Sequence, residues 1–199
     1  MDKKKIINAS VVIIALLVAI LIVFLNSFLS SRSMLQGDYP YYSDVQSITD
    51  AADVIIVGEV IESGNVQDLM VDQTPGRENK EPITYTLSTV RVTEVISGNV
   101  QVGDIITVKQ IGDHQNFPEA TLNEIDGYLK DGQEALMFLA EYENSPYSAV
   151  NQAQGLVEVM DNGELYSASK YSLWGYNDTA TRTSVDTLED AIAEIKGCL

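Results

Sequence analysis

The feature that most restricts this chain is an uncharged segment of 24 residues, from Ile6 to Leu29. Every residue from Val11 to Leu25 is apolar. A helix that is apolar on all its faces needs an apolar environment around its whole surface. A helix of this length extends about 36 Å and crosses the ~30 Å hydrocarbon core of a bilayer. The segment therefore predicts one transmembrane helix over residues 6–29, which is the part of the chain that contacts lipid.

Basic residues flank this segment mainly on its N-terminal side. Lys3, Lys4 and Lys5 precede it, whereas only Arg32 follows it closely. Positively charged flanks of membrane helices remain in the cytoplasm. We therefore expect residues 1–5 to be a cytoplasmic basic stub. The chain is predicted to be a single-pass plasma-membrane protein whose C-terminal domain is extracytoplasmic.

A cleaved signal peptide is the alternative interpretation of the same segment. It has the same charged start, and Ser27, Ser30 and Ser31 provide small residues for a cleavage site. Its apolar region usually covers only about 7–15 residues, so the greater length here favours an uncleaved anchor. Both interpretations place residues 33–199 outside the cytoplasm.

Charge divides the chain sharply. Twelve Lys and Arg against 29 Asp and Glu give a net charge of −17. Residues 1–32 hold four of the basic residues and one of the acidic ones, which leaves 8 basic and 28 acidic residues, a net charge of −20, for the remainder. Such a domain lacks the cations that bind a nucleic-acid backbone, so no nucleic-acid partner is expected. One Cys and one His exclude an intramolecular disulfide, Cys-cluster metal sites and two-His zinc sites.

Residues 30–43 contain Ser, Gly and Pro without apolar periodicity and predict a linker. It would join the membrane helix to an extracytoplasmic domain over residues 44–199. Three tyrosines lie in the linker, namely Tyr39, Tyr41 and Tyr42. They either rest at the lipid headgroups, where aromatic residues are common, or pack on the start of the domain.

Beyond the linker, β-branched and apolar runs predict a mainly β domain of five or six strands with short helices at its ends. Polar residues 63–82 predict a long exposed loop, and residues 112–131 predict a second loop with a weak helical patch. The predicted strands cover residues 53–62, 83–96, 104–111, 134–142, 156–160 and 164–167, and the predicted helices cover 44–52, with Ser43 as N-cap, and 184–196.

The apolar phase changes within the strand at 83–96. Tyr85 and Leu87 share one parity, whereas Val90 and Val92 share the other. A shift of one residue turns every side chain to the opposite face unless a bulge absorbs it. The phase change predicts a bulge or sharp bend near Ser88–Thr89. Strands that bend in this way close small antiparallel barrels.

Four segments follow one another in a recognisable order. They are ADVIIVGEVIE (52–62), TLSTVRVTEVISGNVQVGDIITVKQIG (86–112), LKDGQEALMFL (129–139) and QGLVEVMDNGEL (154–165). This order resembles uncharacterised membrane-anchored surface proteins of Gram-positive bacteria, whose ectodomain is similar in pattern to the OB-fold of the netrin and metalloproteinase-inhibitor modules. The resemblance implies a small antiparallel OB-like barrel. The inhibitor family reaches a protease metal with an N-terminal Cys-x-Cys, which this chain lacks, so metalloprotease inhibition is not implied.

Few residues suggest chemistry. His114 lies in a polar segment without an orienting partner and is interpreted as a loop residue. Cys198 is either an incidental terminal residue or the source of an intermolecular disulfide. Asp68/Asp72 and Asp161–Glu164 are the closest calcium candidates, but the latter is better explained as a hairpin turn. No catalytic, cofactor-binding or metal residue is predicted, and no cofactor is expected.

An aromatic group in the segment SKYSLWGYND is the strongest candidate for recognition. Tyr171, Trp174 and Tyr176 either anchor a partner on the surface or, in the simpler interpretation, leave Trp174 to close one end of the barrel. The leading functional hypothesis is a membrane-anchored extracytoplasmic domain that binds a protein or a cell-envelope component without catalysis. The alternatives are a cell-envelope enzyme whose carboxylate or metal chemistry the spacing does not reveal, and a protease-inhibitor-like module.

Overall fold

One seven-stranded β-sheet is the main element of the part of the chain that the structure describes. The computed structural model describes residues 40–70, 82–114, 127–167, 169, 171–176 and 187–199. Half of these residues lie in strands and 14% in helices, so the mainly β class predicted from the sequence is confirmed. The predicted transmembrane segment 6–29 lies outside the described residues. Within the described residues, no helix has the length and apolarity needed to span a membrane.

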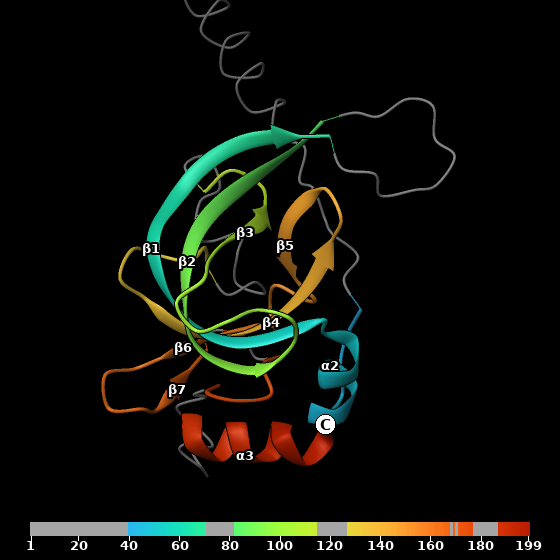
Figure 1. The fold of residues 1–199 in the computed structure, drawn as a ribbon, viewed down its shortest axis with the longest axis vertical. Coiled ribbons are helices and arrows are strands. Elements are labelled where there is room, and N and C mark those ends of the chain that lie inside the picture. The colour runs from blue at the N-terminus through green and yellow to red at the C-terminus, as the bar shows by residue number, and fades with distance from the viewer. Residues whose placement is uncertain (1–39, 71–81, 115–126, 168, 170, 177–186) are drawn as a thin grey trace, which may run out of the picture. The chain divides into compact units, whose positions relative to one another are not determined.

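Five of the seven strands form a closed ring (Figure 1). Around the ring the order is β1, β2, β3, β5 and β4, because β1 also pairs with β4; β6 and β7 extend the sheet beyond β4. All described strand pairs are antiparallel except β3–β5, which is parallel. The elements are α2 (Val45–Ala51), β1 (Val54–Leu69), β2 (Ile83–Ser97), β3 (Ile105–Ile111), β4 (Glu134–Tyr142), β5 (Ser145–Ala149), β6 (Leu156–Val159), β7 (Leu165–Tyr166) and α3 (Leu188–Cys198).

Two apolar cores lie on opposite faces of β1. Val54 and Ile56 pack with apolar residues of β2, β3 and β4 in the core of the ring. Ile55 and Val57 belong to a second core, which includes apolar residues of β4, β6, α2 and α3. Successive side chains of a strand point to opposite faces, so a strand covered on both faces needs a continuous apolar run. The run at 54–57 therefore correctly predicted burial on both faces.

The first strand is longer than predicted. β1 continues to Leu69, so residues 63–69 of the predicted loop 63–82 are a strand that pairs with β2 down to Leu69–Ile83. Its side chains from Ile61 onward are exposed or half-buried. Because little of this arm is buried, its sequence lacks the apolar alternation that indicates a strand. Residues 71–81 lie outside the described residues.

The predicted bend falls on the neighbouring strand. β2 pairs with β3 without a register shift from Tyr85 to Arg91, so β2 has no bulge at Ser88–Thr89 on that side. The β1–β2 pairing has four register shifts, and the two nearest this position place their extra residues in β1 between Val60 and Asn65, opposite Thr89 and Leu87. A bulge inserts its extra residue on one strand only. The irregularity therefore lies across the sheet from the predicted position, with its extra residues in β1.

The apolar phase misled the prediction because β2 is buried on both faces there. Thr86 and Ser88 alternate in register with Val90 and are also buried, whereas Tyr85 and Leu87 are buried on the opposite face. The inner face thus continues through hydroxyl side chains. Because Thr86 and Ser88 are polar, the regular alternation of inward-facing side chains along β2 cannot be seen as an alternation of apolar residues in the sequence.

The remaining elements agree closely with the predictions. β4 has the predicted bounds, and β6 and β7 form the predicted hairpin, with Gly163 at a φ of +79°. β5 was not predicted.

Helix α2 is capped by Asp44 and not by Ser43, because the Asp44 carboxylate accepts a hydrogen bond from the Ser47 amide. Helix α3 begins after its N-cap Thr187, and residues 177–186 lie outside the described residues. So do residues 115–126, most of the loop 112–131 in which a weak helical patch was predicted.

The end of the predicted linker is attached to the domain. The buried Gln154 side chain accepts from the Tyr42 amide at 2.9 Å and donates to the Tyr42 carbonyl at 2.8 Å. Asn151 donates to the carbonyl of Pro40 at 2.9 Å. Tyr42 therefore packs on the domain, the second of the two alternatives, while Tyr41 remains exposed. Tyr39 lies outside the described residues.

Candidate functional site

The predicted aromatic group is not one exposed surface. Trp174 is 4% exposed, and its ring stacks on Phe138 with centroids 5.6 Å apart and planes 10° apart. Its Nε1 donates to Glu194 of α3 at 3.2 Å. Trp174 is therefore a core residue between β4 and α3. Its burial agrees with the simpler of the two sequence interpretations, but it lies in the core shared with α2 and α3 and not in the core of the ring, whose end it was predicted to close.

The two tyrosines of this group lie in different surroundings. Tyr171 is half-buried, meets the ring of Tyr41 edge-on at 6.1 Å, and accepts a hydrogen bond from Gln154 at its carbonyl. Tyr176 is 46% exposed and follows Gly175, where the chain bridges to Ser167. With Trp174 buried, only these two tyrosines present surface to a partner.

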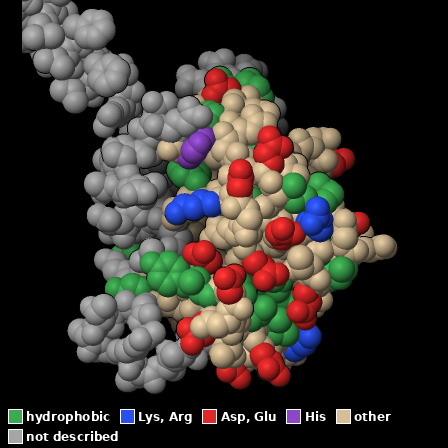
Figure 2. All heavy atoms as spheres, turned by 90° about the vertical axis from the view of Figure 1, so that its left-hand side faces the viewer, with side chains coloured by type: hydrophobic (Ala, Val, Ile, Leu, Met, Phe, Trp, Pro, Cys, Tyr) green, Lys and Arg blue, Asp and Glu red, His purple; other side chains and the backbone are tan. Residues whose placement is uncertain are grey.

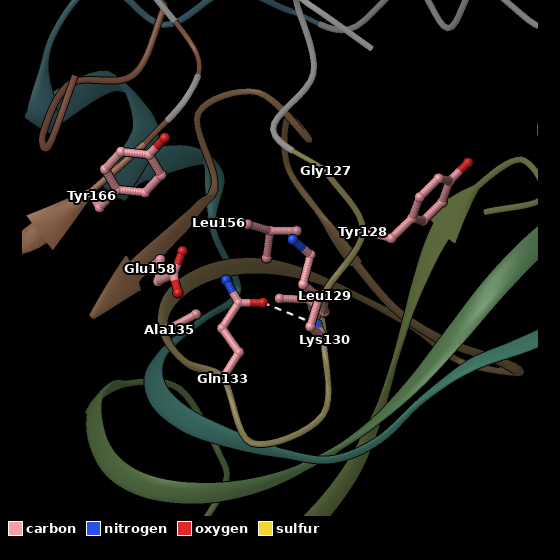
Figure 3. Close-up of a pocket in the computed structure, with 9 residues that line it drawn as sticks. All are labelled: Gly127, Tyr128, Leu129, Lys130, Gln133, Ala135, Leu156, Glu158 and Tyr166. Atoms are coloured by element: carbon pink, nitrogen blue, oxygen red, sulfur yellow. Dashed lines mark hydrogen bonds between the residues drawn. The ribbon is translucent and has the colours of Figure 1, made fainter. Parts of the chain in front are cut away.

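A pocket elsewhere on the domain is the better candidate (Figure 3). It has a volume of about 170 Å³ and opens to solvent. Leu129, Ala135 and Leu156 lie near its centre, and Tyr128 and Tyr166 lie on opposite sides. Such a combination of apolar floor and convergent polar groups is typical of small-ligand sites. Its lining residues are Gly127, Tyr128, Leu129, Lys130, Gln133, Ala135, Leu156, Glu158 and Tyr166.

The wall formed by residues 127–133 is held by side-chain hydrogen bonds. The buried Gln110 of β3 accepts from the Leu129 amide at 2.8 Å and donates to the Gly127 carbonyl at 3.4 Å. Gln133 accepts from the Lys130 amide at 3.0 Å. β4 and β6 supply the opposite wall. The pocket is therefore built by a buried glutamine and two paired strands, and it needs no ligand to form.

Two opposite charges line this pocket without pairing. Lys130 is exposed and Glu158 is half-buried. Within the described part of the chain, neither side chain forms an ion pair. Figure 2 shows carboxylates dispersed over one face of the domain with few cations between them. A free ammonium beside a free carboxylate over an apolar floor is an unusual local arrangement in so acidic a domain, and it can bind a ligand with both charges.

Tyr128 lines the pocket, and its side chain extends away from the pocket's centre (Figure 3). Its hydroxyl donates to the carbonyl of Ile111 at 2.9 Å, and its ring meets His114 edge-on at 6.0 Å. Burial raises the pKa of Tyr128 to about 12, and the nearby Asp113 carboxylate adds to this shift. The phenol therefore stays protonated and remains a donor throughout the neutral range.

A second pair of side chains meets on the outer face of β3 and β5. Lys109 is 2% exposed, and its Nζ lies 2.6 Å from the Oγ of Ser145. The Nζ also lies 4.4 Å from the ring centroid of Tyr142 and 5.3 Å from that of Tyr85. Burial lowers the pKa of Lys109. Sequence reasoning missed this pair because 36 residues separate its members, although a lysine inside the apolar strand DIITVKQI was a signal.

The other candidates from the sequence are structural. The amide of His114 donates to the Thr86 hydroxyl, and its buried Nδ1 has no hydrogen-bond partner among the residues that the structure describes. Cys198 is half-buried and unpaired at the end of α3. Among the described residues, no group of three His, Cys, Asp or Glu side chains could hold a metal ion. Asp72 lies outside the described residues, whereas Asp68 accepts from the Thr84 hydroxyl at 2.6 Å.

Two comparisons with known proteins found no match. No protein-family model matches the chain, and no curated protein matches it. Function must therefore be argued from the pocket and the side chains alone.

Proposed function

We propose that the chain is a single-pass membrane protein whose extracytoplasmic OB-like barrel binds a cell-envelope component or protein through a short peptide segment. The peptide occupies the pocket between residues 127–133 and strands β4, β6 and β7. The observation that carries this proposal is the unpaired Lys130 and Glu158 beside an apolar floor.

The barrel interpretation is supported by the closed ring of β1, β2, β3, β5 and β4. OB-folds are five-stranded, partly open Greek-key barrels that bind ligands with loops and one face. The parallel β3–β5 pair closes the ring across strands that are not consecutive. Helices α2 and α3 cover one face of the sheet, and the face that carries the pocket remains available for recognition.

The peptide ligand follows from charge and size. Glu158 pairs with an amino group, and Lys130 pairs with a carboxylate. Leu129 and Leu156 contact one small apolar side chain, because about 170 Å³ accommodates a single residue and not a folded surface. Such a ligand is a peptide that carries a free amine and a free carboxylate close together.

An NMR titration of the full-length protein in detergent micelles tests this proposal. The probe is the dipeptide alanyl-alanine, and N-acetyl-alanyl-alanine amide is the uncharged control. We expect the charged dipeptide alone to shift the amide signals of Gly127, Leu129 and Leu156. Both Glu158→Gln and Lys130→Met should remove the shifts. The matched controls Glu164→Gln and Lys196→Met change charges outside the pocket and should keep them.

Two results would contradict the pocket assignment. One is the absence of shifts at millimolar dipeptide, and the other is equal shifts with the blocked peptide. Membrane orientation is tested separately by protease treatment of intact cells. We expect fragments of residues 44–199 and protection of residues 1–29; protection of the whole domain would contradict the proposed topology.

A further inference from the structure

The contact between Lys109 and Ser145 has the geometry of a serine nucleophile beside a general base. The parallel β3–β5 pairing, with Val108 opposite Tyr147 and Lys109 opposite Ser148, brings the start of β5 beside the lysine. The resulting Nζ–Oγ distance of 2.6 Å is within the range in which a base removes a hydroxyl proton. Lys109 and Ser145 lie on β3 and β5, and neither residue lines the pocket. Only Tyr142, their neighbour, lies on a strand that also contributes to the pocket, β4. A role for this pair therefore does not depend on the pocket.

The burial of Lys109 disfavours its ammonium form relative to a lysine exposed to solvent. The side chain is 2% exposed, and among the described residues no carboxylate pairs with its Nζ. Loss of hydration disfavours the ammonium form, which is the direction of the pKa shift. The rings of Tyr142 and Tyr85 act in the opposite direction, because aromatic faces attract a cation. A structural lysine normally gains a carboxylate partner when it is buried, and this one has a hydroxyl instead.

Ser145 is placed where a substrate can reach it. It is half-buried and is the first residue of β5, directly after the exposed turn residues Glu143 and Asn144. Tyr142, at the end of β4, is 48% exposed and forms an aromatic wall next to it. The lysine is thus covered, whereas the serine is only half-buried.

We propose that Ser145 is an activated serine nucleophile and that Lys109 is its general base, in acyl transfer from small carboxylic esters or amides. Ser145 Oγ attacks the acyl carbon as its proton moves to Lys109 Nζ. The bond to the leaving alcohol or amine then breaks, and Lys109 returns the proton to that group. Water then attacks the acyl carbon of the acyl-serine as Lys109 accepts its proton. The bond between the acyl carbon and Ser145 Oγ breaks, the carboxylic acid is released, and Lys109 returns the proton to Ser145 Oγ, which regenerates the free hydroxyl.

A serine-directed alkyl fluorophosphonate tests the proposal on the full-length protein in detergent micelles. The probe forms a phosphonate ester with the serine oxygen and releases fluoride, and peptide mass mapping identifies the labelled residue. We expect labelling of Ser145, its loss in Ser145→Ala, and a rate lower by about 100-fold in Lys109→Met. Ser148→Ala is the matched control on the same strand and should leave the rate unchanged.

Lys109→Arg separates a base from a mere positive charge, because arginine keeps the charge and does not give up its proton in this range. We expect it to lose labelling as Lys109→Met does. In the wild-type protein the labelling rate should rise with pH to a plateau whose midpoint lies below 10.5, the ordinary lysine pKa. Far-ultraviolet circular dichroism verifies that each variant is folded. Labelling of Ser145 no faster than of Ser148, or wild-type labelling in Lys109→Arg, would overturn the proposal.

Discussion

The indole of Trp174 stacks on the ring of Phe138, with centroids 5.6 Å apart, and thereby joins the segment before α3 to the central strand β4. This contact lies in the core that α2 and α3 complete. Trp174 therefore connects the C-terminal part of the chain to the sheet, and its loss should be felt in global stability.

We expect Trp174→Ala to lower the free energy of unfolding by about 3–5 kcal/mol, because it leaves a large cavity beside Phe138. Tyr176→Ala, at an exposed position two residues away, should change it by no more than about 0.5 kcal/mol. Urea denaturation followed by circular dichroism measures both, since the variant lacks the only tryptophan. Equal effects of the two substitutions would contradict the core assignment and favour an exposed aromatic surface.

The side chain of Gln154 holds the N-terminal segment of the domain through hydrogen bonds. Its amide satisfies the Tyr42 amide, the Tyr42 carbonyl and the Tyr171 carbonyl. Gln154→Ala should lower stability by about 1–3 kcal/mol, because these groups lose their partner away from water. Chymotrypsin should then cleave faster after Tyr41 and Tyr42.

Gln101→Ala is the control for this experiment, because Gln101 is exposed and its hydrogen bonds within the described residues are made by its backbone amide and carbonyl, which the substitution keeps. It should leave both stability and cleavage unchanged. Unaltered cleavage at Tyr42 in Gln154→Ala would mean that other contacts hold the segment.

Local sequence patterns predicted the elements whose burial is uniform along the strand. Val54–Val57 required cover on both faces, and the residues from Glu134 to Tyr142 form β4 as expected. β5 was missed because its sequence SPYSA contains two serines and a proline. Proline lacks the backbone N–H that donates a hydrogen bond to the neighbouring strand. β5 is a strand because it pairs with β3 and β4, and the sequence of one segment does not show which strands it will pair with.

The candidate sites were beyond sequence reasoning for a related reason. Lys130 and Glu158 come from a loop and from β6, and Lys109 and Ser145 come from β3 and β5. No short motif contains either pair, so only the strand order brings them together. Trp174, in contrast, was recognised from composition alone, although its two interpretations could be separated only by its burial.

Two glycines with similar backbone angles should respond differently to substitution. Gly98 has a φ of +107°, and a Cβ there would lie 2.8 Å from the Asp53 carbonyl oxygen and from a Val54 side-chain carbon. Gly103 has a φ of +94° and no atom within 4 Å of that position. Gly103→Ala should cost only the left-handed conformation, about 1–2 kcal/mol. Gly98→Ala adds the clash and should cost at least about 1 kcal/mol more; equal unfolding midpoints in urea would contradict this.

Tyr128 should make the stability of the protein fall at alkaline pH. Burial and the Asp113 carboxylate raise the pKa of its phenol from 10.0 in the unfolded chain to about 12 in the folded protein. Between these values the folded state binds more protons than the unfolded state, so stability falls as pH rises. The contribution is complete below pH 10 and is lost as pH passes through about 12.

Tyr128→Phe removes this group and keeps the ring against His114. The variant loses the hydrogen bond to Ile111, so it should be less stable than the wild type at pH 8 by about 1 kcal/mol. Between pH 10 and 12 its stability should fall less steeply, and the two curves should converge. Urea midpoints measured at intervals from pH 8 to 12 provide the comparison, and Tyr176→Phe is the control for an exposed phenol. Parallel curves for the wild type and Tyr128→Phe would mean that Tyr128 titrates alike in the folded and unfolded states, and hence that the wall of the pocket is open to water.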